Sequence, residues 1–185
     1  MPDRLYFTDS DEANALIASD PMALLIGFAL DQQVPVQKAF SGPLALRERV
    51  GTLDAAALAD ADLEPAFRER PAIHRFPGSM ARRVHDLAVH IRDEYDGDAA
   101  RVWTDAADSA ALRANLEALP GFGEMKVKIT VAVLAKKFGV KPAGWEAVAA
   151  TWHSVADVDS AETMATARDV KRQMKDYDAK GKVIP

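Results

Sequence analysis

The run Met22–Leu30 constrains the fold more than any other part of the sequence. Its nine positions are all apolar or glycine, so a helix built from them has no face that prefers water. Asp20 and Pro21 precede it in the order that begins a helix, an N-cap carboxylate and then a first-turn proline. Pro35 disfavours helical backbone at the residue before it, so the helix is predicted to end around Gln33. Because such a helix must be buried on all sides, other elements have to surround it.

Helical spacing of apolar residues recurs through the rest of the chain, and no alternating strand pattern competes with it. Residues 60–78 hold four prolines or glycines and are predicted to form turns and short pieces. The two long stripes that follow are expected to begin at Ser79 and Ser109, whose hydroxyls suit an N-cap. The predicted fold class is all-α, in a single domain. Helices are expected over residues 36–50, 54–58, 79–96, 109–119, 127–138 and 160–177.

Composition removes several classes of site. The sequence has no cysteine, which excludes disulfides, Cys-ligated zinc, thiolate-held iron–sulfur clusters and a cysteine nucleophile. With 23 basic and 28 acidic residues the net charge is −5, so any contact with nucleic acid must be local. The longest apolar stretch, of nine residues, is far below the roughly 20 that span a bilayer. We therefore expect a soluble cytoplasmic protein with no membrane partner.

The turn Pro120-Gly121-Phe122-Gly123 separates two helical stripes and is the most informative local motif. Glycine lets the backbone approach a partner closely, and the amides at the start of the second helix can bind an anion such as DNA phosphate. Two basic segments suit that ligand: residues 124–141 hold five lysines against one glutamate, and residues 68–85 hold five arginines against one glutamate. The alternative is an ordinary helical hairpin with solvated lysines.

Three motifs in order resemble one known family. Leu119-Pro-Gly-Phe-Gly-Glu-Met-Lys126 resembles the hairpin of the helix-hairpin-helix (HhH-GPD) DNA glycosylase superfamily. Leu30-Asp-Gln-Gln-Val-Pro35 resembles its upstream glutamine segment, and Phe76-Pro-Gly-Ser-Met-Ala-Arg-Arg-Val84 resembles a helix between the two. The resemblance covers about residues 20–145. Within the superfamily, the chain is most similar to the 3-methyladenine glycosylase branch and resembles its small actinobacterial-type members.

The resemblance implies a two-lobed fold and a nucleoid-associated monomer that binds damaged double-stranded DNA. A six-helix barrel lobe would span about residues 22–138, with the hairpin at 109–138, and a second lobe would combine residues 1–21 and 139–185. Members flip the target base out of the duplex, which leaves a gap in the stack. By resemblance Gln33 would fill that gap, and Gly121, Gly123 and Lys126 would contact DNA. The alternative for Gln33 is a polar residue that bonds to backbone at the helix end.

The resemblance also implies that a monovalent cation could bind at the hairpin. Many members hold a monovalent cation at the hairpin through main-chain carbonyls, and Glu117, Leu119 and Phe122 match those positions. No cofactor is expected to be required, and no iron–sulfur cluster is expected.

The catalytic residues of the family are not matched. Base removal builds positive charge on the sugar, which a nearby carboxylate stabilises. The family places an aspartate about twenty residues past the hairpin, but Pro142-Ala143-Gly144 has no acid. Bifunctional members carry a nucleophilic lysine where this chain has Met125, and a thioether cannot form a Schiff base. Lyase activity is therefore disfavoured, and Lys126 is expected to contact phosphate.

Two other acids are candidates for the catalytic carboxylate. Asp31 is the first because the matching position in the family faces the pocket, and Glu146 is the second because it follows the vacant position closely. The alternatives are an Asp31 that bonds to backbone amides or arginine, and a Glu146 that is a solvated acid at a helix start. Met125 and Trp145 are candidates for the base pocket, although an aromatic residue such as Trp145 is more often core.

Three functions remain open at this point. The first is a monofunctional DNA glycosylase that excises an alkylated or deaminated base. The second is a relative without catalysis that binds a lesion or an abasic site. The third is a helical scaffold with an unused hairpin.

Overall fold

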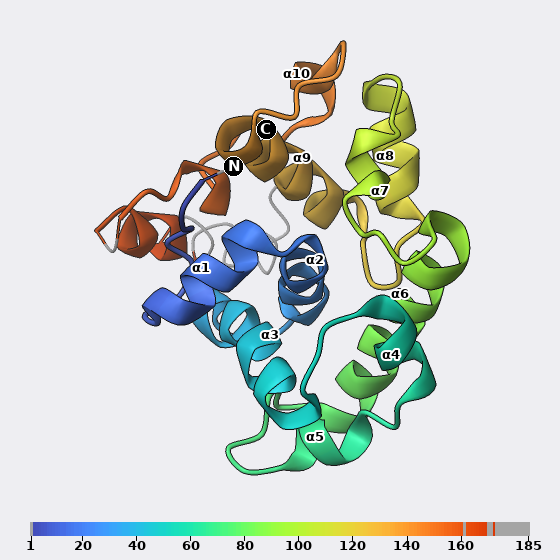
Figure 1. Cartoon of the computed structure of the whole chain (residues 1–185). Coiled ribbons are helices and arrows are strands. Elements are labelled where there is room, and N and C mark those ends of the chain that lie inside the picture. The colour runs from blue at the N-terminus through green and yellow to red at the C-terminus, as the bar shows by residue number, and fades with distance from the viewer. Residues whose placement is uncertain (1, 161, 170–171, 173–185) are drawn as a thin grey trace, which may run out of the picture.

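The computed structural model describes residues 2–160, 162–169 and 172 of the chain (Figure 1). All secondary structure within these residues is helical, which confirms the all-α prediction for this part of the chain. Residues 162–169 are helical as well, and the remainder of the predicted helix 160–177 lies outside the described residues. The elements are α1 (Asp11–Ser19), α2 (Pro21–Leu30), α3 (Val36–Val50), α4 (Ala55–Asp60), α5 (Glu64–Arg68), α6 (Pro77–Tyr95), α7 (Arg101–Thr104), α8 (Ser109–Glu117), α9 (Glu124–Phe138), α10 (Trp145–Val148) and the 3-10 turn η1 (Val155–Asp157).

Helix α2 is the central element of the core. All nine residues of Met22–Leu30 are buried, as the all-round apolar pattern predicted. Asp20 caps the helix by accepting hydrogen bonds from the backbone amides of Met22 at 2.8 Å and Ala23 at 3.1 Å. Helices α1, α3 and α6 pack against it and supply the cover that it requires (Figure 1). The segment before residue 22 therefore packs directly on α2 and α3 through α1.

The contact between α2 and α3 depends on a glycine. A Cβ added at Gly27 would lie 2.4 Å from Cδ1 of Phe40. The Phe40 ring packs edge-on against Phe7 at 5.0 Å and against Phe28 at 5.1 Å between centroids. The absence of a side chain at position 27 thus lets three aromatic rings fill the space between α2 and α3.

Three helix ends differ from the sequence prediction. Helix α2 ends at Leu30 rather than around Gln33, and Gln33 adopts a left-handed backbone conformation with φ of 57°. Helix α6 begins at Pro77 rather than at Ser79, because proline suits the first helical turn. The cap of α8 is Asp108, whose carboxylate accepts from the Ala111 amide at 2.8 Å.

The other helices are arranged around α6 and α9. Helices α4 and α5 pack on α6, α8 packs on α7, α9 and α10, and η1 packs on α9. Among the described residues, no single helix is long and apolar enough to cross a membrane; α1 and α2 reach that length only as a pair bent by 114°.

Replacement of Gly27 by alanine tests the α2–α3 contact. In an open helix this change adds up to about 1 kcal/mol of stability. Here we expect a loss of about 1–3 kcal/mol in the free energy of unfolding, because the new methyl group meets the buried Phe40 ring. Urea unfolding measures the difference. The double variant Gly27→Ala/Phe40→Leu provides the control and is expected to recover part of the loss. If the effects of the single variants Gly27→Ala and Phe40→Leu simply add in the double variant, the contact is contradicted.

Candidate nucleic-acid interface

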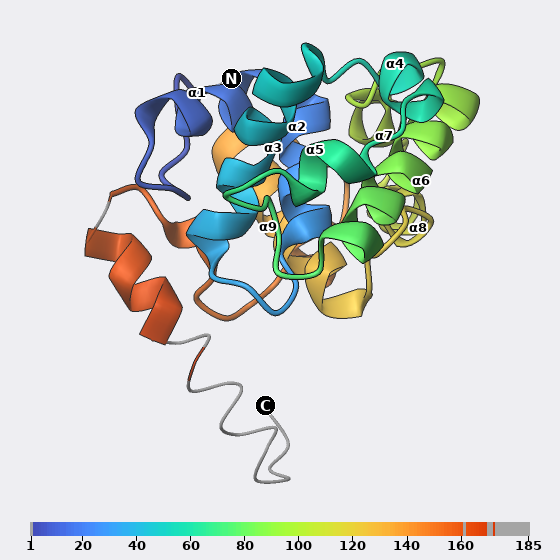
Figure 2. The same ribbon diagram turned by 90° about the horizontal axis from the view of Figure 1, so that it is seen from below.

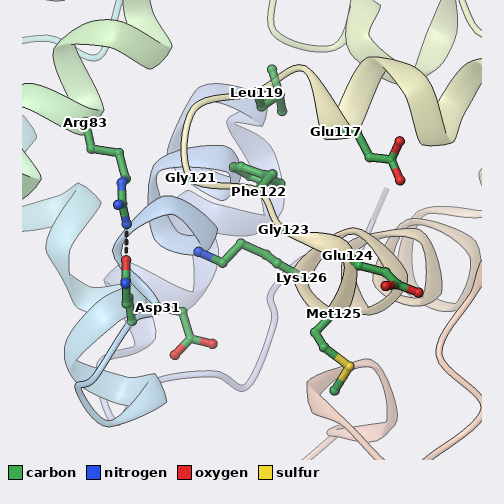
Figure 3. Close-up of a pocket in the computed structure, with 11 residues that line it drawn as sticks. Asp31, Arg83, Glu117, Leu119, Gly121, Phe122, Gly123, Glu124, Met125 and Lys126 are labelled. Carbon is green, nitrogen blue, oxygen red and sulfur yellow. Dashed lines mark hydrogen bonds between the residues drawn. The ribbon is translucent and has the colours of Figure 1, made fainter.

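Three segments that are distant in sequence line one open pocket of about 650 Å³ (Figure 3). The end of α2 contributes Asp31 and Gln32, and α6 contributes Arg83. The third segment is the hairpin between α8 and α9, from Glu117 to Lys126. The structure therefore brings the hairpin together with the upstream glutamine segment that the sequence analysis singled out.

The hairpin presents the positive end of α9 to this pocket. The turn closes through a hydrogen bond from the Phe122 amide to the Leu119 carbonyl at 3.1 Å, and Gly121 takes a φ of 84° that favours glycine. Gly123 is the N-cap of α9, and glycine has no side chain with which to cap the helix. The first turn of this 15-residue helix lines the pocket, where the helix dipole adds partial positive charge.

Arg83 connects the hairpin to the end of α2. Its guanidinium donates a hydrogen bond to Oε1 of Gln32. Its side chain also lies against the turn, where a Cβ at Gly121 would be 2.6 Å from Arg83 Cδ. A single cation from α6 therefore contacts both other walls of the pocket.

His74 supports the turn that follows α2 from inside the protein. The residue is 1% exposed. Nδ1 accepts from the Phe76 amide at 3.0 Å, so the neutral ring carries its proton on Nε2 and donates it to the Gln32 carbonyl at 3.1 Å. Burial lowers the pKa of His74 below its ordinary value of 6.5, and the Arg83 and Lys38 charges lower it further. His74 is thus a neutral residue that holds the turn.

Asp31 and Lys126 both project into the space between the end of α2 and the start of α9 (Figure 3). Asp31 is partly buried, and its backbone amide donates to the carbonyls of Gly27 and Phe28 at the helix end. The Lys126 ammonium lies 5.5 Å from the centroid of the Phe122 ring. The pocket therefore contains one carboxylate and one amine from the two elements that the motifs identified.

The two other acids in the lining are engaged away from the pocket centre. Glu117 accepts from Arg113 at 2.6 Å, and Glu124 pairs with Lys128 at 2.8 Å. The hydrogen bond and the charge of Lys128 lower the pKa of Glu124. Both carboxylates point away from Asp31 in Figure 3. They do not occupy the amides at the start of α9.

The remaining candidate residues lie at the edge of the pocket or outside it. Met125 lines the pocket and is 47% exposed. Gln33 is exposed on the turn and borders a neighbouring cavity instead. Trp145 and the exposed Glu146 lie in α10, which packs against α8 and α9, and neither lines the pocket. The structure therefore brings Asp31 to the hairpin and leaves Glu146 apart.

The predicted cation site falls on the hairpin side of the pocket, which Glu117, Leu119 and Phe122 line. The Leu119 carbonyl accepts one hydrogen bond from the Phe122 amide, and a carbonyl oxygen has a second lone pair for a cation. The cation stays a prediction. Within the described part of the chain, no cluster of three or more His, Asp or Glu residues could hold a metal ion.

The sequence assigned no role to Gln32 and counted Arg83 only among the five arginines of segment 68–85. For His74 it allowed either an acid or base in the pocket or a loop residue that forms hydrogen bonds. The partners Arg83 and Gln32 are 51 residues apart, and His74 and Gln32 are 42 residues apart. The one available signal was that residue 83 belongs to the arginine-rich segment 68–85.

A change of His74 to glutamine tests its part in the stability of the turn. The unfolded chain binds a proton at position 74 below about pH 6.5, whereas the folded chain resists it, so the free energy of unfolding of the wild type should fall as the pH drops through this window. The variant should lack this part of the decline. It should also be less stable at pH 7.5 by about 1–3 kcal/mol, because two backbone groups lose their partner.

Urea unfolding at several pH values measures both effects. His85→Gln is the control, because the side chain of His85 is 40% exposed and pairs with its sequence neighbour Asp86. A His74→Gln variant that keeps the wild-type pH profile would contradict the assignment.

Comparison with known proteins gave no relative: no family model matches the chain, and no curated protein or solved structure matches it. The helix-hairpin-helix resemblance rests on the three motifs alone, and the family assignment stays a prediction.

Proposed function

We propose that the protein is a monofunctional DNA glycosylase that binds damaged duplex DNA at the hairpin pocket and releases an alkylated or deaminated base. One observation carries this proposal. The start of α9 at Gly123, the cations Arg83 and Lys126 and the carboxylate of Asp31 line a single open pocket. These are an anion-binding group, charges that suit a phosphate backbone, and an acid that can act on a sugar.

The start of α9 is the phosphate-binding part of the proposed site. A Cβ at Gly123 would meet no atom within 4 Å, so an anion can approach the first-turn amides. Such amides bind phosphate because they point at the ligand and the helix dipole favours negative charge. Lys126 and Arg83 would add positive charge from the side of the pocket.

Asp31 is the proposed catalytic carboxylate. Cleavage of the bond between the base and C1′ leaves positive charge on the sugar, and an adjacent carboxylate stabilises that charge. The same carboxylate can accept a proton from water as the water oxygen bonds to C1′, while the base leaves with the bonding electrons and takes up a proton from solvent. Gln33 would fill the gap in the base stack, because it is exposed on the turn that begins with Asp31.

A relative that binds lesions without turnover is the second candidate. Residues 142–144 carry no acid, and Glu146 lies outside the pocket lining. The proposed catalysis therefore depends on Asp31 alone. If this carboxylate does not act on the sugar, the same surface would still bind a lesion or an abasic site.

The two-lobed arrangement is part of the same proposal, and the pocket would belong to the barrel lobe of residues 22–138. The pocket is lined by the end of α2 and α6 on one side and by the α8–α9 hairpin on the other. An open site between such segments suits a duplex that lies across it and a base that enters it.

A charge at Gly123 tests the phosphate-binding step. Gly123→Asp places a carboxylate at the N-cap, where aspartate is well tolerated by a helix. We expect the affinity for duplex DNA to fall at least tenfold, about 1.4 kcal/mol, because the new charge covers the amides and repels phosphate. Fluorescence anisotropy with an abasic-site duplex at low salt measures the change. Gly123→Ala is the neutral control, and equal affinity in the two variants would remove α9 from the DNA site.

Base release tests the catalytic step. DNA treated with an alkylating or a deaminating agent is incubated with the protein, and the supernatant is analysed by mass spectrometry. The wild type should release a modified base, and Asp31→Asn should lose about 100-fold or more in rate, which is the usual contribution of a positioned acid or base. Glu146→Gln is the control and should keep the wild-type rate.

Two results would contradict this assignment. An unchanged rate in Asp31→Asn would exclude Asp31 as the catalytic carboxylate. A covalent adduct between Lys126 and abasic DNA after borohydride reduction would contradict a monofunctional enzyme, because it requires an imine with the lysine amine. No release, with a preference for damaged over undamaged duplex in binding, would support the second candidate.

A further inference from the structure

A second cavity, of about 750 Å³, lies beside the proposed site and is lined by Arg68, Arg70 and Arg75. It is formed by the end of α5, the connection to α6 and the first residue of α6. Among the residues that the structure describes, no carboxylate lines it. The cavity therefore concentrates positive charge on a chain whose net charge is −5.

Two of the three arginines are available for a ligand. Arg68 is paired with Glu64 at 2.6 Å. Arg70 and Arg75 are exposed, and neither forms an ion pair within the described part of the chain. The Arg75 guanidinium lies 4.8 Å from the centroid of the exposed Phe76 ring, which limits its freedom without neutralising its charge.

The backbone that carries these arginines is held in place by other cations. Arg49 donates hydrogen bonds to the carbonyls of Ala66 at 2.7 Å, Glu69 at 3.0 Å and Pro71 at 2.8 Å. Lys38 donates to the Ala72 carbonyl at 2.5 Å. The like charges of Arg70 and Arg75 are thus presented on an ordered loop, and a bound anion would relieve their repulsion.

A single buried residue, His74, connects the cavity with the hairpin pocket. His74 lines the cavity, and its ring donates to the carbonyl of Gln32, which lines the hairpin pocket. Figure 2 shows the connection between α5 and α6 descending to the same edge of the molecule as residues 31–35 and the start of α9. Two cationic sites side by side along one edge suit a linear polyanion better than an isolated small anion.

We propose that Arg70 and Arg75 bind backbone phosphates of the duplex that occupies the hairpin pocket, so that the DNA footprint extends over the connection between α5 and α6. This inference rests on the proposed function and adds a second contact surface to it. The contacts would be independent of base sequence, because only phosphate is recognised. They would lengthen the minimum duplex that binds with full affinity.

The salt dependence of binding tests the inference. The affinity of the wild type and of Arg70→Gln/Arg75→Gln for an abasic-site duplex is measured by anisotropy between about 50 and 200 mM salt. Each lost phosphate contact makes the negative slope of log K against log salt less steep by about 0.9, so the slope of the double variant should be less steep by about 1.8. Over this range its affinity should fall about tenfold less than that of the wild type. The slope of the single variant Arg75→Gln should be less steep by about 0.9, which keeps the test valid if the double variant fails to fold.

A matched control removes the same charge elsewhere. Arg4→Gln/Arg47→Gln also lowers the net charge by two, but these arginines are paired with Asp11 and Glu12. The control should keep the wild-type slope. A wild-type slope in the folded Arg70→Gln/Arg75→Gln variant would overturn the inference and leave the proposed function intact.

Two further results would also overturn the inference. Loss of binding to a poly-glutamate probe in the double variant, with an unchanged slope for DNA, would assign the cavity to an acidic protein. Absence of any DNA affinity in the wild type at low salt would overturn the proposed function as well.

Discussion

The burial of α2 on all sides is the constraint on which the rest of the structure depends. A helix without a polar face can be stable only inside a layer of other helices, and α1, α3 and α6 form that layer. Asp31 is the first polar residue after this helix, so it is also the first that can reach the surface. The end of the most apolar element thus becomes one wall of the proposed site, and Gly27 allows the approach of α3 that keeps it covered.

The second wall is a hairpin whose position depends on interactions between distant residues. Arg83 contacts the turn at Gly121 and bonds to Gln32, while the buried His74 bonds to the carbonyl of the same glutamine. These contacts join α6, the end of α2 and the hairpin into one framework. A pocket with such support presents Asp31 and Lys126 in a defined arrangement, which a catalytic or binding site requires.

Acidic and basic side chains near the proposed site are paired unequally, and an acidic protein needs such an excess of local positive charge to bind a polyanion. Glu117 and Glu124 are paired with basic residues of their own helices, whereas Arg70 and Arg75 are left without carboxylate partners in the described chain. The positively charged start of α9 and the loop that carries Arg70 and Arg75 lie at one edge of the molecule (Figure 2). Local charge of this kind can attract phosphate although the net charge of the chain is −5.

Sequence alone determined the all-α class, the buried helix and the hairpin, because these follow from apolar spacing and from turn residues next to each other in the chain. It identified Asp31, Gly123 and Lys126 on motifs, and all three line the pocket. Only the tertiary structure decided that Glu146 lies apart and that Arg83 enters the site. The physical reason is that these placements depend on packing between helices and on hydrogen bonds across 42 and 51 residues, which local patterns do not encode.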